Sequence, residues 1–261
     1  MSGRVAIVTG AARGIGAATA RRLAAGGWWV SLVDVCADEP TLGYSLATPS
    51  DLAGAVADTD GRGVGVVADV RDQAALDRAV VETVQRWGRL DAAVAAAGVI
   101  GGGRPGWETP DDVWESVLGV DLTGVWRLAR AAIPALLAVP APRSGRFVAV
   151  SSVAGTTGLP QLAAYSAAKH GVVGLVRALG VELAGTGVTA NAVAPGSTDT
   201  AMLAATTGLY DLDGADELVA HQPLGRAITP DEVAEAIGWL CDGAAAVTGT
   251  VLAVDGGMTA R

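Results

Sequence analysis

One tyrosine and the only lysine of the chain stand four residues apart. The stretch "AYSAAKHG" at 164–171 contains Tyr165 and Lys169, and the other 17 of the 18 basic residues are Arg. On a helix, residues i and i+4 share one face, so the phenol and the ammonium are expected to point into the same space. A nearby ammonium lowers the pKa of a phenol, which is ordinarily about 10. Such a tyrosine can exchange a proton with an alcohol near neutral pH, and the small neighbouring side chains leave room for a cofactor and a substrate.

Ser152 follows an apolar run at 145–151 and is expected to complete this centre. Its hydroxyl would hold a substrate oxygen beside the phenol. The alternative is a helix with one ordinary Tyr–Lys pair, which is common by chance. The sole lysine, the serine after a strand and the loop described next together favour catalysis.

A glycine-rich loop, "VTGAARGIG" at 8–16, follows an apolar run and opens a helix-length stretch. Gly10, Gly14 and Gly16 allow close backbone approach and positive φ. The free N–H groups and the positive dipole end of a helix beginning near Ile15 favour phosphate. The alternative is a tight strand–helix turn that simply needs small residues.

Asp34 follows Gly16 by 18 residues and ends the next apolar run. An acidic residue at this place accepts hydrogen bonds from an adenosine ribose diol and repels a 2′-phosphate, which favours NAD over NADP. Arg13 opposes this choice, because a cation there could attract the 2′-phosphate. We give Asp34 more weight, since no basic residue follows it directly. Asp69 ends the third run and is expected either to accept the adenine amino group or to cap the next helix.

The elements that must position these residues are short apolar runs alternating with helix-length stretches. Near-continuous apolar runs are typical of strands buried on both faces, and the alternation predicts an α/β, Rossmann-type, doubly wound parallel sheet with helices on both faces. Pro134 should kink or divide the helix expected at 111–138. The strands are expected at 4–9, 29–34, 63–69, 90–96, 145–151, 187–193 and 250–255. The helices are expected at 14–26, 73–87, 111–138, 164–184 and 230–241.

Length and composition favour one domain over residues 1–261 in a globular protein. A net charge of −9 makes nucleic acid and anionic membranes unlikely partners. Cys36 and Cys241 fit no metal spacing, and a disulfide between them is not expected in an intracellular protein. The first ten residues contain no long apolar run, and no later run has the length of a membrane span, which predicts a cytoplasmic protein.

Two longer segments interrupt the alternation and are expected to be functional. Residues 36–52 are rich in turn formers, and residues 197–226 are expected to form a lid over a substrate. The lid segment contains Met202, Leu203, Leu209, Tyr210 and Leu212, and Trp107 is expected near its mouth. These side chains favour an apolar alcohol or ketone, although ordinary packing of a helical lid would give the same pattern.

The chain resembles a single-domain short-chain dehydrogenase/reductase over essentially its full length. The matching stretches are "TGAARGIG" (9–16), "ADV" (68–70), "AAAG" (95–98), "VSS" (150–152), "YSAAK" (165–169), "NAVAPGSTDT" (191–200) and "VDGG" (254–257). The resemblance implies a seven-stranded sheet, hydride transfer between a substrate carbon and nicotinamide, and a homotetramer. It implies that Tyr165 is the general acid/base, that Lys169 holds the nicotinamide ribose, and that Ser152 orients the substrate.

The cofactor-binding residues implied by this resemblance and by the loop are Gly10, Arg13, Gly14, Ile15, Gly16, Asp34, Val35, Asp69, Val70, Ala96, Gly98, Tyr165, Lys169, Pro195, Thr198 and Thr200. The chain departs from the family at two places. Ala95-Ala96-Ala97-Gly98 replaces the usual Asn-Asn-Ala-Gly, and Asp121 in "VDLTG" stands where the family has its fourth catalytic residue, an asparagine. We assign Asp121 to the catalytic group, either through its charge beside Lys169, as a proton relay, or through its backbone alone.

Within the family, "CADEPTLGYSLATPSDL" (36–52), "AAVAAAGVIGGGRPGWETPD" (92–111) and "HQPLGR" (221–226) resemble the mycofactocin-coupled subgroup. That resemblance implies a tightly held NAD whose electrons leave through the peptide-derived carrier mycofactocin. Two other functions are open to a chain with these motifs. Asp121 and the missing amides slightly favour a catalytically weakened dinucleotide-binding sensor or scaffold, whereas a sugar-nucleotide epimerase would need a C-terminal substrate domain.

Overall fold

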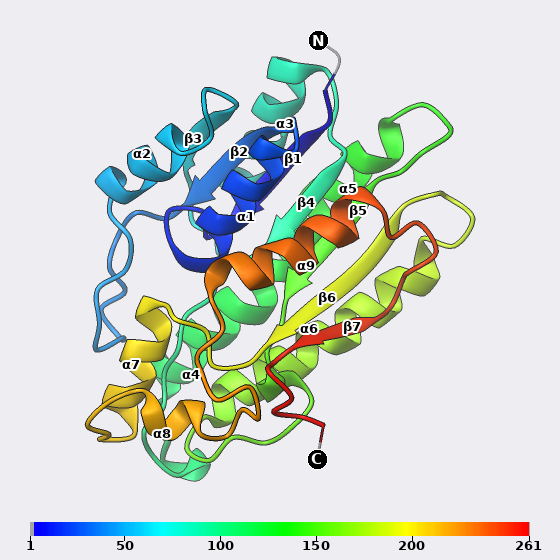
Figure 1. The fold of residues 1–261 in the computed structure, drawn as a ribbon. Coiled ribbons are helices and arrows are strands. Elements are labelled where there is room, and N and C mark those ends of the chain that lie inside the picture. Colours follow the sequence, from blue (N-terminus) through cyan, green and yellow to red (C-terminus); the bar gives the residue numbers. More distant parts are fainter. Residues whose placement is uncertain (1–2, 261) are drawn as a thin grey trace.

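Seven parallel strands form one sheet in the computed structural model, which describes residues 3–260 (Figure 1). Across the sheet the order is β3-β2-β1-β4-β5-β6-β7. Successive strands are therefore added toward one edge from β1 to β3 and toward the other edge from β4 to β7. The strands are β1 (Val5–Thr9), β2 (Trp29–Asp34), β3 (Gly63–Val67), β4 (Ala92–Ala95), β5 (Arg146–Val150), β6 (Thr189–Pro195) and β7 (Val251–Val254). The predicted doubly wound parallel sheet is therefore confirmed, and ligands of such sheets bind at the carboxyl ends of the strands near this change of direction between β1 and β4.

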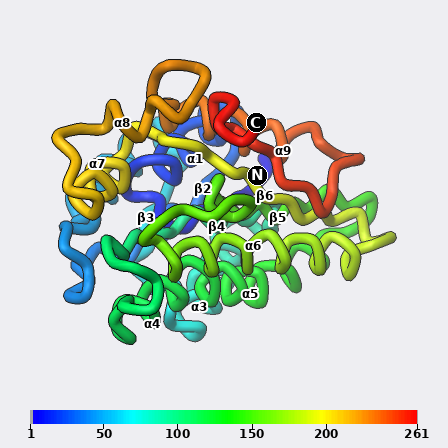
Figure 2. The backbone as a smooth tube through the Cα atoms, turned by 90° about the horizontal axis from the view of Figure 1, so that it is seen from below, coloured from blue at the N-terminus to red at the C-terminus, as the bar shows by residue number. Residues whose placement is uncertain are grey.

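Helices cover both faces of the sheet, as the two perpendicular views show (Figures 1 and 2). One face carries α1 (Gly14–Ala25), α2 (Pro49–Ala57) and α9 (Pro230–Asp242). The other carries α3 (Gln73–Trp87), α5 (Val125–Ala138) and α6 (Ala163–Glu182), with α4 (Asp111–Leu118) packed against α6. Two shorter helices, α7 (Ala201–Leu209) and α8 (Asp216–Val219), lie beyond the carboxyl ends of the strands.

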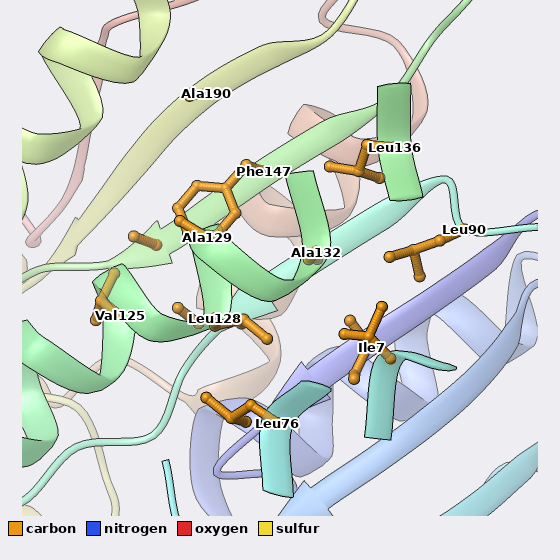
Figure 3. Close-up of a cluster of buried hydrophobic side chains, with 14 of the residues drawn as sticks. Ile7, Leu76, Leu90, Val125, Leu128, Ala129, Ala132, Leu136, Phe147 and Ala190 are labelled. Atoms are coloured by element: carbon orange, nitrogen blue, oxygen red, sulfur yellow. The ribbon is translucent and has the colours of Figure 1, made fainter. Parts of the chain in front are cut away.

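The core between the sheet and the second helical face is made of fully buried aliphatic side chains and one phenylalanine. Ile7 and Phe147 from the sheet meet Leu76 of α3 and Leu128 and Leu136 of α5 (Figure 3). A second cluster fills the opposite face, so the central strands are buried on both sides. This explains why their sequences are almost continuously apolar.

Local sequence signals fix several helix ends. Asp72 caps α3 by accepting hydrogen bonds from the Ala74 and Ala75 amides, and Gly88 ends it with φ 83°. The capping box of Thr229 and Glu232 starts α9. These devices satisfy backbone groups that a helix end leaves free, so the predicted bounds at 73–87 and 230–241 lie close to the observed ones.

The expected single helix at 111–138 is divided, but not at Pro134. A π-helical turn, η2 (Gly119–Gly124), separates α4 from α5, and α5 continues through Pro134. A proline removes only one N–H from a helix, and the buried Leu128 and Leu136 on either side hold α5 against the sheet. π-turns are often found at functional sites, and this one contains Asp121.

The two interrupting segments contain more regular structure than expected. The last residues of 36–52 begin α2, where Thr48 and Asp51 form a capping box and Pro49 takes the first helical position. Residues 36–48 are irregular and are called the strap below, and 197–226 contain α7 and α8. Within residues 3–260, the structure contains neither a helix suited to crossing a bilayer nor a group of three His, Cys, Asp or Glu side chains placed for a metal ion.

Candidate active site

The predicted serine, tyrosine and lysine meet at the carboxyl end of β5. Ser152 follows β5 directly, and Tyr165 and Lys169 lie one turn apart on α6. All three side chains line one cavity of about 430 Å³, which we call the substrate cavity. The Nζ atom of Lys169 lies 5.4 Å from the centre of the Tyr165 ring. The structure thus places the phenol and the ammonium in the same space, as their helical spacing predicts.

Asp121 contacts Lys169 from behind the cavity. Its Oδ2 lies 3.0 Å from Nζ of Lys169, and its Oδ1 accepts a hydrogen bond of 2.8 Å from the Val99 amide. Lys169 also donates to the carbonyl of Val150 at 3.2 Å. Asp121 is fully buried and lines neither of the cavities described here. Whatever Asp121 contributes must therefore pass through Lys169 or through the backbone.

The ionisation of Tyr165 and Lys169 is set by opposing effects. Burial raises the pKa of the Tyr165 phenol and Asp121 raises it further, while Lys169 and the Ser152 hydroxyl lower it, and the net shift is upward. For Lys169, burial lowers the pKa, but Asp121 and Tyr165 outweigh it and the net shift is also upward. The sequence predicted a lowered phenol pKa. That prediction is wrong for the net shift because it took account of the ammonium but not of the burial.

A second cavity of about 510 Å³ adjoins the first, and we call it the cofactor cavity. The two share Ile15, Ala96, Gly98, Thr200 and Met202. Twelve predicted cofactor residues line the cofactor cavity: Gly10, Arg13, Gly14, Ile15, Gly16, Asp34, Val35, Asp69, Val70, Ala96, Gly98 and Thr200. The other four, Tyr165, Lys169, Pro195 and Thr198, line the substrate cavity.

The glycines of the loop allow close backbone packing and positive φ at the edge of the cofactor cavity. A Cβ at Gly16 would lie 2.1 Å from the Gly10 carbonyl oxygen, and one at Gly10 would lie 2.6 Å from Ala97. Gly10 and Gly14 have φ of 65° and 58°. The first turn of α1 has no capping side chain and no acidic residue, so its N–H groups face the cavity without a competing carboxylate.

Asp34 holds the glycine loop from the end of β2. Its Oδ2 accepts a hydrogen bond of 3.0 Å from the Ala12 amide, and its carboxylate lines the cofactor cavity. Arg13, the competing cation, donates to the carbonyl of Ser45 at 2.9 Å. The guanidinium is thus anchored to the strap, and Arg13 still lines the cofactor cavity.

Asp69 does not cap α3, because Asp72 does so. Instead, Asp69 accepts hydrogen bonds from the backbone and the guanidinium of Arg71, whose Nη1 also contacts Glu39 of the strap at 2.5 Å. Burial raises the pKa of Asp69, but the bonds from Arg71 outweigh it and the pKa is lowered. The capping role is therefore wrong, and the adenine contact stays a prediction.

The strap also supplies a residue that the sequence did not single out, Tyr44. Its hydroxyl accepts a hydrogen bond of 2.9 Å from the Ile100 amide, and its ring lines the cofactor cavity. Burial raises the pKa of Tyr44 to about 12. Tyr44 packs with Leu42 and Leu46 against the cluster that contains Tyr165 and α7. In Figure 1 the strap descends in blue toward α7. The sequence contains one signal for it: Tyr44 is one of only three tyrosines in the chain, and it lies within a turn-rich insertion.

The segment 197–226 closes the substrate cavity on the side of α7 and α8. Met202, Leu203, Tyr210 and Leu212 line it, and Leu209 packs in the adjoining cluster. The Tyr165 hydroxyl points toward Sδ of Met202 at 4.0 Å. Trp107 was expected near the mouth of the substrate cavity, but it lines neither cavity. It lies on a short 3-10 turn at 106–108, where its side chain is 87% exposed.

Comparisons with known proteins show which family the chain resembles over its length. A family profile described as enoyl-(acyl carrier protein) reductase matches residues 10–259. The chain is 40% identical to a protein of Mycobacterium tuberculosis named an uncharacterized NAD-dependent oxidoreductase, across 98% of this chain and 96% of the relative. It is 43% identical to cis-4-hydroxycyclohexanecarboxylate dehydrogenase of Sinomonas cyclohexanicum, across 98% and 97% of the two chains.

The crystal structure of carveol dehydrogenase from Mycobacterium avium in complex with NAD superimposes with a TM-score of 0.93 at 35% identity, covering 100% of this chain and 99% of that one. Both the sequence and the arrangement of the strands are therefore shared along the whole chain. The protein is an oxidoreductase that belongs to the short-chain dehydrogenase/reductase family.

Proposed function

We propose that this protein is an NAD-dependent dehydrogenase of secondary alcohols, or a reductase of the corresponding ketones. The observation that carries the proposal is that Ser152, Tyr165 and Lys169 line one cavity that opens into the cavity of the glycine loop. A substrate carbon held there lies next to the space for a dinucleotide. When bound, NAD accepts a hydride from the alcohol carbon.

The side chains of this chain manage the proton of that reaction. Tyr165 takes the proton of the alcohol oxygen during oxidation and returns it during reduction. The Ser152 hydroxyl hydrogen-bonds the same oxygen, and Lys169 stabilises the phenolate by its positive charge. Asp121 acts as a positioning residue, because it holds the ammonium by an ion pair of 3.0 Å without reaching the cavity.

The cofactor is NAD rather than NADP. Asp34 lines the cofactor cavity and would meet a 2′-phosphate with a like charge. Arg13, which could offset that charge, is bound to Ser45 of the strap. The names of the Mycobacterium tuberculosis relative and of the carveol dehydrogenase structure both specify NAD.

The strap retains the NAD after each turnover, and mycofactocin then carries the electrons away. Three contacts tie the strap to three different loops of the cofactor cavity: Arg13 to Ser45, Arg71 to Glu39, and the Ile100 amide to Tyr44. A segment fastened in this way slows release of what lies beneath it. The resemblance of residues 36–52 to the mycofactocin-coupled subgroup supports the identity of the acceptor.

The substrate is an apolar alcohol or ketone of moderate size, and residues 197–226 are its lid. The cavity is walled mainly by aliphatic side chains and has a volume suited to a small cyclic molecule. The relative named for hydroxycyclohexanecarboxylate and the structure named for carveol both point to cyclic alcohols.

We place the protein in the cytoplasm as a homotetramer of single-domain subunits. Exposed tryptophans on the outer helices, Trp114, Trp126 and Trp239, provide apolar surface for subunit contacts. Mass spectrometry of the purified protein under non-denaturing conditions reports the bound nucleotide and the number of subunits together. A tetramer carrying NAD, reduced on addition of a cyclic secondary alcohol, is expected. Protein that binds NAD but reduces it with no alcohol would favour the sensor or scaffold function.

A further inference from the structure

We infer that the substrate cavity selects uncharged alcohols against alcohols that bear a carboxylate, and that Glu217 is a specificity-determining residue at its rim. The inference rests on the proposed dehydrogenase function and specifies which substrates that site accepts. It also separates this protein from its relative named for a hydroxycyclohexanecarboxylate, although the two chains are 43% identical.

The walls of the substrate cavity offer a carboxylate few partners. The hydroxyl groups of Ser152, Thr198, Thr206 and Tyr210 line part of the cavity, and much of the remaining wall is apolar, with Ile100, Leu159, Leu162, Met202 and Leu203. The apolar side chains accommodate a hydrocarbon ring but cannot hydrogen-bond an anion. A carboxylate moved from water into such surroundings loses part of its hydration, and the neutral hydroxyl groups replace it only in part.

The cations near the cavity are already occupied. Among the residues that line it, Lys169 is the only Lys or Arg, and its ammonium is bound by Asp121 at 3.0 Å and by the Val150 carbonyl at 3.2 Å. The next cation along the lid, Arg226, is paired with Glu232 at 2.6 Å. Neither is free to pair with a substrate carboxylate.

The lid itself is acidic. Residues 197–226 contain one Arg, Arg226, and five acidic side chains, which are Asp199, Asp211, Asp213, Asp216 and Glu217. Glu217 lines the substrate cavity together with His221. Glu217 is exposed at the rim, so its repulsion of an anion is screened by water and is modest. The larger effect comes from the partly desolvated carboxylate, which meets no free Lys or Arg among the lining residues.

Two substrates test the inference: cis-4-hydroxycyclohexanecarboxylate and its methyl ester, which differ by one negative charge and one methyl group. The nicotinamide absorbance measures the initial reduction of bound NAD by each substrate, at one pH for both. We expect kcat/KM for the ester to exceed that for the acid by roughly 100-fold or more.

Two variants identify the origin of the selectivity. Glu217→Gln should reduce the ester-to-acid ratio by roughly two- to fivefold, as expected for one screened charge. Leu212→Arg, which places a cation in the wall, should reduce it by about tenfold or more, as expected for a partly desolvated ion pair. Asp213→Asn is the matched control, because it removes a charge from the same segment at a residue that does not line the cavity, and its ratio should equal that of the wild type.

The outcomes separate this inference from the function on which it rests. An acid that reacts as well as its ester would overturn the charge selection and leave the dehydrogenase function intact. An unchanged ratio in both Glu217→Gln and Leu212→Arg would overturn the assignment to this rim. Failure of the ester and of every other neutral alcohol to reduce NAD would overturn the proposed function and this inference with it.

Discussion

The ammonium of Lys169 lies 3.0 Å from a carboxylate oxygen of Asp121, and both side chains are almost completely buried. The ion pair stands directly behind the Tyr165 phenol, whose ring centre is 5.4 Å from the same nitrogen. Because opposite charges stabilise one another, Asp121 favours the ammonium and weakens its effect on the phenol. The pKa of both Lys169 and Tyr165 is raised in consequence, although burial makes the largest contribution to that of Tyr165.

Replacing Asp121 with asparagine should shift the pH dependence of alcohol oxidation toward acid. The substitution removes a negative charge that raises the pKa of Tyr165, so the phenolate forms at lower pH. The measurement is the pH–rate profile of Asp121→Asn beside the wild type, with thermal unfolding to verify the fold. Superimposable profiles would show that the side chain is incidental, and loss of activity at every pH would show instead that Asp121 relays protons.

Asp34→Ala should relax the preference for NAD over NADP by roughly ten- to 100-fold. The variant removes a carboxylate that accepts hydrogen bonds from the ribose and repels a 2′-phosphate. A hydrogen bond to a charged group contributes about 1.5–3 kcal/mol. Affinity for both nucleotides should also fall, since Asp34 holds the Ala12 amide of the glycine loop. Dissociation constants from fluorescence titration provide the ratio. Tighter binding of NADP than of NAD by the wild type would show that Arg13 dominates.

Tyr44→Phe should speed the release of NAD by roughly tenfold. The substitution leaves the Ile100 amide without its acceptor, and an unsatisfied buried group costs about 1–3 kcal/mol. The exchange of bound NAD against labelled NAD measures the effect directly. Ser45→Ala is the matched control in the strap, because Arg13 binds only the backbone carbonyl there. Fast exchange in the wild type would refute the retention of NAD by the strap.

Gly16→Ala should weaken NAD binding by more than about tenfold, since a Cβ would lie 2.1 Å from the Gly10 carbonyl and force the loop apart. Gly54→Ala on α2, where nothing lies within 4 Å of the new atom, is the control and should bind NAD normally. Equal affinities of the two variants, measured by calorimetry, would mean that the loop does not cradle the cofactor.

Features that depend on local pattern could be predicted from the sequence. The central strands are buried on both faces, so apolar runs marked them in the sequence. Tyr165 and Lys169 lie on one face of α6 because a helix repeats every 3.6 residues. The glycine loop was likewise identified from spacing alone.

Features that depend on packing between distant residues could not be predicted. The contact of Tyr44 with Ile100 joins residues 56 apart in sequence, and no local signal encodes it. The π-turn at 119–124 replaced a break expected at Pro134. The net pKa shift of Tyr165 was missed for the same reason, because the burial that causes it is a property of the folded chain.

The most direct test of the proposed chemistry is the comparison of Tyr165→Phe with the wild type for both turnover and NAD binding. The phenylalanine ring fills the same buried space but has no proton to exchange, so kcat for a cyclic secondary alcohol should fall roughly 100- to 10,000-fold. The dissociation constant for NAD should stay close to that of the wild type. Turnover close to the wild-type rate in Tyr165→Phe, with NAD bound normally, would contradict the role assigned to Tyr165 and the mechanism built on it.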